Sequence, residues 1–197
     1  MGITETQAND EAPMLADHLA LDLLNTEARK DAALVDFWRR GEDVIRWLEQ
    51  HGVAAPALTK AADRDELLTQ AKALRTLAQR LIDARRDGKP VDTTELNRYL
   101  HAYLGAPSLE HDSQGKLVLS RVVRAAPAAA LLGPVAQALA ELLAEGDFAL
   151  VKQCEHPDCI LWFYDRTKAH KRRWCSMTTC GNRYKAAQFR KKAAEKA

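Results

Sequence analysis

The first 153 residues of this 197-residue chain contain no cysteine, and no stretch is apolar for the roughly 20 residues that a membrane-spanning helix requires. The acidic and polar segment 1–14 lacks the cationic start and apolar run of a secretory signal. We therefore expect a cytoplasmic protein. With 47% hydrophobic and 28% charged residues, its composition is that of a globular protein and not of a disordered one.

Motifs of catalysis are also missing from the sequence. It has no glycine-rich phosphate-binding loop, no G-x-S-x-G elbow, and no paired acid and base beside a nucleophile. We therefore expect no enzymatic activity.

The net charge of +2 conceals an uneven distribution. Residues 151–197 carry 12 Lys and Arg against 4 Asp and Glu, whereas residues 1–150 carry 17 against 23. An acidic body with a basic tail favours a polyanionic partner for the tail, although a solvated charged surface would produce the same pattern. We expect two domains, 1–146 and 147–197.

The body is predicted to be mainly α-helical with a small β-hairpin. Apolar residues recur at helical spacing in five segments, which are 15–24, 43–50, 64–86, 92–103 and 127–145. Gly88 and Pro90 should end the third helix, and Asp92 with Glu95 predicts a capping box for the fourth. Pro134 either kinks the fifth helix or starts a second one.

Four further segments are predicted to form strands. The runs 108–110 and 116–122 flank the turn Asp112–Gly115, which is typical of a hairpin. Farther along, residues 148–151 and 160–164 are predicted to form short strands on either side of the first cysteine pair.

All four cysteines lie within 27 residues, with the spacing C-x4-C-x15-C-x4-C: Cys154, Cys159, Cys175 and Cys180. Clustered cysteines in a cytosolic chain are more often metal ligands than disulfides, and four thiolates complete the tetrahedral shell of a structural Zn²⁺. Four thiolates leave no position open for catalysis. Because C-x4-C is a looser spacing than C-x2-C, His156 could replace one of the cysteines as a zinc ligand, but the indication is weak. A redox-active pair of cysteines would more typically have the spacing C-x-x-C.

The arrangement of these cysteines predicts a treble-clef finger. The first pair occupies a turn between two strands, and Cys180 begins a helix whose N-terminal dipole favours thiolate. Beside this site lie the candidate nucleic-acid-binding residues, which are Arg166, Lys168, Lys171, Arg172 and Arg173 in the loop and Asn182, Arg183, Lys185, Arg190, Lys191 and Lys192 on the helix. Lys and Arg would bind phosphates and Asn182 could read a base, although an Asn there more often bonds backbone.

The tail resembles the CGNR zinc finger of bacteria. The resemblance rests on Phe163-x-Asp165-x-Thr167, on the run Arg172–Met177, and on Cys-Gly-Asn-Arg at 180–183. Ahead of it, Leu19–Thr26 and Leu96-Asn97-x-x-Leu100 are similar to the ABATE domain that is usually fused to this finger. The resemblance implies a stress-induced transcription regulator whose finger binds DNA.

The body adds a candidate effector site and a candidate dimer interface. His18, Asp22 and Asn25 are polar residues in an apolar helix, and they either make structural hydrogen bonds or line a pocket for a small molecule. A single finger binds nucleic acid weakly, which favours a homodimer. RNA binding, or protein interaction with a purely structural zinc, are the alternatives to DNA binding.

Overall fold

The computed structural model describes residues 11–30, 33–53, 58, 60–103, 105–111, 113–123 and 127–194. The Cα positions group into two compact units. One unit comprises Met1–Phe37 together with Glu145–Ala197, and the other comprises Trp38–Ala144. The N-terminal segment thus lies in the same unit as the cysteine-rich tail. The domain boundary predicted at residue 146 stays a prediction.

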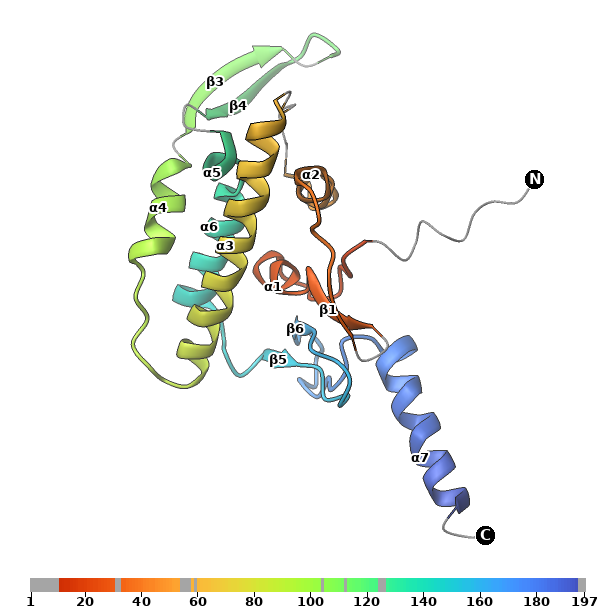
Figure 1. Cartoon of the computed structure of the whole chain (residues 1–197). Helices are drawn as coiled ribbons and strands as arrows, with labels where there is room; N and C mark the ends of the chain where they lie inside the picture. The colour runs from red at the N-terminus through yellow and green to blue at the C-terminus, as the bar shows by residue number, and fades with distance from the viewer. Residues whose placement is uncertain are drawn as a thin grey trace, which may run out of the picture. The chain divides into compact units, whose positions relative to one another are not determined.

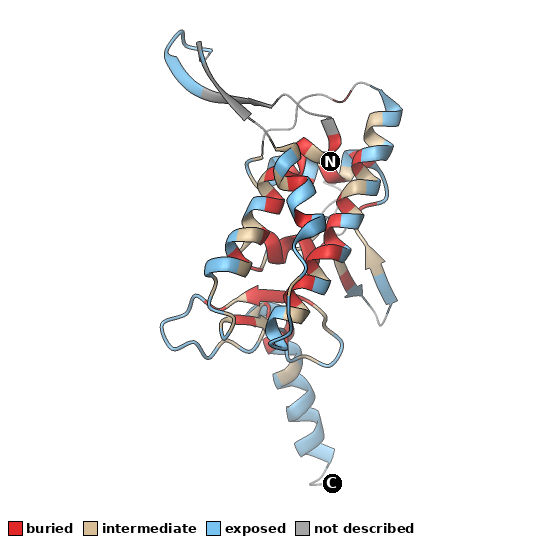
Figure 2. Ribbon diagram, turned by 90° about the vertical axis from the view of Figure 1, so that its left-hand side faces the viewer, coloured by how far each residue is buried: buried red, intermediate tan, exposed pale blue. Residues whose placement is uncertain are grey.

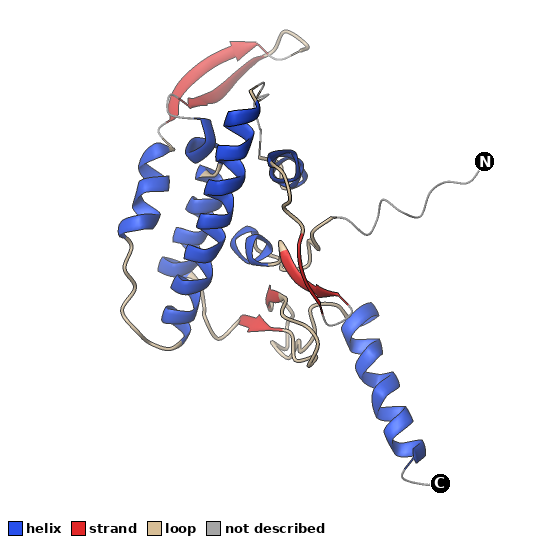
Figure 3. Ribbon diagram, in the orientation of Figure 1, coloured by secondary structure: helices blue, strands red, loops and turns tan. Residues whose placement is uncertain are grey.

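Helices dominate the fold, as predicted (Figure 3). Five of them lie in the described part of the second unit: α2 (Gly41–Gln50), α3 (Ala61–Arg86), α4 (Thr94–Ala102), α5 (Pro127–Leu131) and most of α6 (Gly133–Glu145). The predicted helices 43–50 and 64–86 are confirmed, with starts two and three residues earlier.

Helix α3 follows the predicted periodicity. Its buried positions Leu67, Ala71, Leu74 and Leu81 recur at intervals of three, four and seven residues and form one apolar face. The helix ends where Gly88 adopts a φ of +68°, and the N–H of Lys89 donates to the carbonyl of Ala84 at 2.8 Å. This is a Schellman ending, which satisfies carbonyls that the helix itself leaves free.

The segment 127–145 forms two helices in place of one. Helix α5 ends at Leu131 and α6 begins at Gly133, with Pro134 in its first turn. The ring of Tyr103 occupies the space that a Cβ at position 133 would need, so that this residue has to be glycine. Pro134 therefore marks a second start, which its fixed φ favours.

The capping box predicted at Asp92 and Glu95 is wrong. Helix α4 begins at Thr94, and the Asp92 carboxylate accepts from the Thr94 N–H at 3.0 Å. The Glu95 carboxylate does not reach back to the backbone because it pairs with Arg80 at 2.6 Å.

The predicted hairpin is confirmed. Strands β3 (Gly105–His111) and β4 (Leu117–Val123) pair antiparallel, with Leu109 opposite Leu119. Gly115 in the turn has a φ of +77°, which only glycine adopts readily. Asp112 lies outside the described residues.

The first unit combines short elements from both ends of the chain (Figure 1). They are α1 (Leu19–Leu24), β1 (Glu27–Lys30), β2 (Ala33–Asp36), β5 (Val151–Gln153), β6 (Trp162–Tyr164), the π-helical turn η1 (Met177–Gly181) and α7 (Asn182–Ala194). The hairpin of β1 and β2 was not predicted from the sequence. The strand predicted over 148–151 begins only at Val151, because Asp147 accepts from the Ala149 N–H and forms a turn.

Helix α1 is shorter than the predicted 15–24. The Asp22 carboxylate accepts from the N–H groups of Leu15 and Ala16 at 3.0 Å each, and Asp17 has a φ of +56°. A helix cannot pass through a left-handed residue, so α1 begins only after His18.

One hydrophobic cluster of the first unit surrounds the cysteines. Its buried members are Ala28, Leu161, Phe163, Cys154, Cys175 and Cys180, with Leu15, Phe37, Cys159 and Trp174 packed against them. Figure 2 shows the contrast with α7, which is exposed beyond its first turn. In the described part of the chain, no helix has both the length and the apolar character needed to cross a bilayer.

Candidate metal centre and basic surface

The four cysteine sulfurs converge on one point. All of them lie within 4.8 Å of one another, with 3.8 Å between Cys159 and Cys175 and 3.6 Å between Cys175 and Cys180. A tetrahedron with Zn–S bonds of about 2.3 Å has S···S edges of about 3.8 Å, so the separations fit one zinc ion. The predicted structural zinc is thus supported by geometry, and no coordination position is left over for substrate.

The first pair is held by a tight turn after β5. The Cys154 N–H donates to the Leu161 carbonyl at 2.8 Å, and the Cys159 N–H donates to the His156 carbonyl at 2.9 Å. The Nδ1 atom of His156 accepts from the Asp158 N–H at 3.2 Å. His156 therefore stabilises the turn and lies outside the group of metal ligands.

The second pair is held by the π-helical turn η1, which lies between Ser176 and α7. The Gly181 N–H closes this turn on the Ser176 carbonyl at 3.1 Å. A Cβ on Gly181 would lie 2.5 Å from the Met177 sulfur and 3.3 Å from the Trp174 ring. A side chain at position 181 would therefore force Met177 to move aside and would press on the Trp174 ring. Cys180 lies just before α7 and not in its first turn.

Proton sharing among the thiols perturbs all four groups. Hydrogen bonds from Cys159 and Cys175 hold the pKa of Cys154 far below its usual range. The bond with Cys154 raises the pKa of Cys159 to about 12 and also raises the pKa of Cys175, and burial raises the pKa of Cys180. Zinc binds thiolates, so it has to displace these protons, and acid favours the protonated cluster.

Asp165 organises the loop that follows β6. Its side chain is fully buried and accepts from Lys152 Nζ at 2.7 Å, from Thr167 Oγ1 at 2.6 Å and from the Arg172 N–H at 2.9 Å. Burial by itself raises the pKa of this carboxyl, but these hydrogen bonds outweigh burial and hold the pKa well below its usual range. The Phe-x-Asp-x-Thr motif thus has a structural explanation.

Arg172 connects the N-terminal segment to the finger. Its guanidinium donates to the Leu15 carbonyl at 2.9 Å, to the Cys175 carbonyl at 2.6 Å and to the Asp17 carboxylate at 2.5 Å. It also lies over the Phe163 ring, 4.3 Å from the centroid. The side chain is only 20% exposed, and the predicted phosphate contact would compete with these bonds.

The three candidate effector residues make hydrogen bonds within the first unit. His18 caps α1 by accepting from the Ala20 N–H, and Asp22 binds the backbone before α1. Asn25 is buried, donates to the Trp162 carbonyl at 3.0 Å and accepts from the Trp162 N–H at 2.8 Å. The ABATE-like motif therefore contacts the finger directly, and sequence reasoning missed this because its partners lie about 140 residues away.

The basic residues separate into two groups. Three arginines of the loop have partners within the protein: Arg166 with the Asp17 carbonyl, Arg172 as described, and Arg173 with Glu155 at 2.6 Å. The second group is exposed and forms no ion pair with any residue that the structure describes; its members are Lys168, Lys171, Arg183, Lys185, Arg190, Lys191 and Lys192. Asn182 donates to the Thr178 carbonyl at 3.2 Å and so caps the turn.

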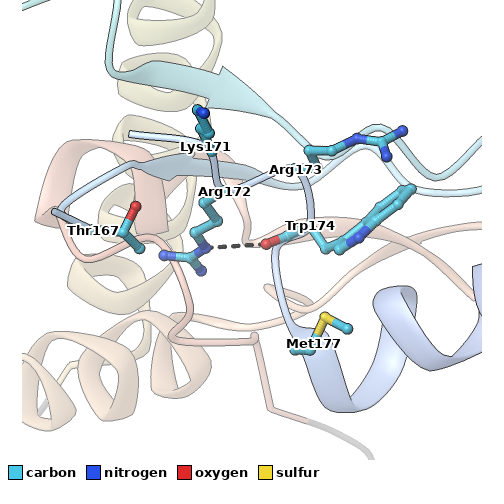
Figure 4. Close-up of a pocket in the computed structure, with 6 residues that line it drawn as sticks. All are labelled: Thr167, Lys171, Arg172, Arg173, Trp174 and Met177. Carbon is cyan, nitrogen blue, oxygen red and sulfur yellow. Dashed lines mark hydrogen bonds between the residues drawn. The ribbon is translucent and has the colours of Figure 1, made fainter. Parts of the chain in front are cut away.

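A cavity of about 500 Å³ opens beside the basic loop (Figure 4). It is lined by Thr167, Lys171, Arg172, Arg173, Trp174 and Met177. The ring of Trp174 lies 4.8 Å from that of Tyr184, and the Arg173 guanidinium lies 4.8 Å from the Trp174 centroid. These contacts fasten the first turn of α7 to the metal centre.

Beyond that first turn, α7 extends away from the finger (Figure 1). None of its 13 residues is buried, and the side chain of Phe189 is 75% exposed. Phe189 was not predicted to be a functional residue, although the sequence places this aromatic residue alone among the Lys, Arg and Ala residues of 185–194.

Comparison with known families agrees with this arrangement. Residues 17–146 match the ABATE family, described as "Putative stress-induced transcription regulator", and residues 151–193 match the CGNR zinc finger. Neither is a family of enzymes. Among curated proteins, no match was found. The chain therefore belongs to the ABATE family and carries a CGNR zinc finger at its C-terminal end.

Proposed function

We propose that the protein is a transcription regulator that binds duplex DNA through α7 and the loop 166–173. The observation that carries this proposal is the state of α7, which is exposed from Lys185 to its end, carries five Lys and Arg, and has no acidic residue. Apart from the contact of Tyr184 with Trp174 in its first turn, α7 buries no side chain against its own chain, and a partner outside the chain would explain its sequence.

The charge of the surrounding surface supports a polyanion. Residues 166–194 contain ten Lys and Arg and no Asp or Glu. Three of the ten, Arg166, Arg172 and Arg173, bind groups within the finger and the N-terminal segment. The other seven are exposed and have no ion partner among the described residues, so they are available to bind phosphates. Lys and Arg contacts to phosphates supply affinity, and contacts to base edges supply preference.

Duplex DNA is favoured over RNA by the shape of α7. At 13 residues the helix is about 20 Å long, and the major groove of B-DNA admits a helix, whereas that of A-form RNA is too narrow. Zinc fixes the finger and does not react, since four cysteines surround its site. Protein interaction without nucleic acid is the rival proposal, and it predicts no affinity for DNA at physiological salt.

Control by a small molecule would act through the N-terminal segment. His18, Asp22 and Asn25 are committed to backbone contacts, so an effector that bound there would break contacts between α1 and the finger. Its binding would then change DNA affinity. A thermal-shift screen of metabolites, followed by DNA titration with each stabilising compound, tests this part of the proposal.

Anisotropy titration of a labelled 24-base-pair duplex, with single-stranded and duplex RNA in parallel, tests DNA binding. The variant Lys185→Ala/Arg190→Ala/Lys192→Ala should weaken binding at least tenfold. The control variant Arg80→Ala/Lys89→Ala/Arg98→Ala removes the same charge from exposed positions of the second unit and should leave affinity nearly unchanged. Equal losses in both variants, or tighter binding to RNA, would contradict the proposal.

A further inference from the structure

One face of α7 is apolar between two rows of cations. Ala186, Phe189 and Ala193 follow one another at intervals of three and four residues and form an apolar stripe, with Asn182 on the same face at the N-terminal end of the helix. Phe189 is the large member of this stripe and is 75% exposed. Burying a phenylalanine is favourable, and a partner that covers this face would gain that energy.

Cations border the stripe on both sides. Arg183 and Arg190 lie along one edge, and Lys185 and Lys192 lie along the other, each pair seven residues apart. Seven residues correspond to about 10.5 Å along the helix axis. The stripe therefore has an apolar centre with positive charge on two sides, which matches a groove whose two walls carry phosphates.

Other occupants fit the stripe less well. A second copy of α7 would bring two helices with five cations each into contact, without one acidic residue to compensate. An anionic lipid surface would meet the cations, but the stripe offers one large apolar side chain and two alanines, whereas interfacial helices bury several Trp, Phe or Leu. The small alanines instead permit close approach to base edges in a groove.

Resting on the proposed binding of DNA by this helix, we infer that Phe189 contacts the 5-methyl group of thymine in the major groove. Among base edges, this methyl group is the apolar feature of the major groove, and apolar side chains, Phe included, recognise it. Asn182 lies two turns away on the same face, although its amide nitrogen is held by the Thr178 carbonyl. Phe189 is thus the residue through which α7 favours A·T base pairs.

Substitution of thymine by uracil tests the inference, because uracil differs only by lacking the methyl group. The zinc-loaded full-length protein is titrated with alternating poly(dA-dT) and with alternating poly(dA-dU). Wherever the protein binds along these polymers, the first presents the methyl group and the second does not. Burial of one methyl corresponds to about fourfold in affinity. We expect about fourfold tighter binding to the thymine polymer, and a similar gain when poly(dG-dC) is replaced by its 5-methylcytosine form.

The variant Phe189→Ala should bind all four polymers but lose both differences, and Phe189→Leu should retain part of them. Lys191→Ala, on the opposite face of α7, should weaken binding to every polymer equally. Equal affinity of the wild type for thymine and uracil polymers would overturn the inference and leave the proposed DNA binding intact. A thymine preference that persists in Phe189→Ala would also overturn it, because DNA shape would then explain the difference.

Two further outcomes concern the partner. Absence of salt-dependent binding to any of the polymers would overturn the proposed function and this inference together. Phe189-dependent binding to vesicles of phosphatidylglycerol, tighter than binding to DNA, would overturn the inference in favour of a lipid surface.

Discussion

Asn25 and Trp162 lie 137 positions apart in the chain and exchange two hydrogen bonds. The Asn25 side chain donates to the Trp162 carbonyl at 3.0 Å and accepts from its N–H at 2.8 Å. The buried side-chain amide of Asn25 thus satisfies the backbone N–H and carbonyl of one residue of β6, as the backbone of a neighbouring strand would. The ABATE-like N-terminal motif is therefore part of the structure that supports the zinc finger.

Replacing Asn25 by Ala should destabilise the first unit by about 3 kcal/mol, because the N–H and carbonyl of Trp162 would lose their buried partner. Chemical denaturation followed by Trp fluorescence measures the loss. The control is Asn97→Ala on the exposed face of α4, which should change stability little. Equal effects of the two substitutions would refute the role assigned to Asn25.

Replacing Arg172 by Ala should cost about 3 kcal/mol and speed the loss of zinc to a chelator, because the guanidinium binds carbonyls from both the N-terminal segment and the finger. Arg172→Lys should rescue little, since an ammonium cannot replace the fork of donors. Lys168→Ala removes an exposed cation of the same loop, without an ion partner among the described residues, and is the control. Zinc release at the wild-type rate from Arg172→Ala would be inconsistent with this prediction.

The metal centre could be predicted from the sequence because its ligands are close together in the chain. The spacing of four cysteines and the periodicity of α3 are local signals, and both predictions are confirmed. The roles of Asn25 and Arg172 depend on partners more than 130 residues away, and no local pattern indicates such contacts. From charge alone, Arg172 could not be distinguished from Lys171, although Lys171 is exposed and the Arg172 side chain is only 20% exposed.

Other differences arise where tertiary packing overrides local preference. The apolar period over 127–145 is continuous, but Tyr103 packs against Gly133 and the helix is interrupted there. The first residues of the predicted helix 15–24 are held by the Asp22 carboxylate, which takes the amides of Leu15 and Ala16. The assignment of the basic residues to nucleic acid remains a prediction.

Asp165→Asn should destabilise the protein by about 3 kcal/mol at neutral pH, since Lys152 would lose its buried partner. The folded pKa of Asp165 is lowered, so its contribution is complete above the unfolded value of about 3.9 and falls only as pH drops below that value. The difference between wild type and variant should stay constant from pH 8 to pH 5.5 in denaturation experiments. A difference that shrinks between pH 8 and pH 6 would contradict this explanation.

Gly181→Ala should destabilise the finger by about 1 kcal/mol, because the new Cβ would displace the sulfur of the half-exposed Met177 side chain from its position. Met177→Ala removes that sulfur, so the double variant should recover part of the loss in a double-mutant cycle. Additive effects of the two substitutions would show that the two side chains do not compete for this space.

The salt dependence of DNA affinity tests the central claim most directly. If the seven exposed cations bind phosphates, log Kd should vary with log salt with a slope magnitude of about 6, and affinity should fall roughly three to four decades between 50 and 200 mM. Each single replacement among Arg183, Lys185 and Arg190 should reduce the slope by about 1. A slope near zero, or one that these replacements leave unchanged, would contradict binding of DNA by α7.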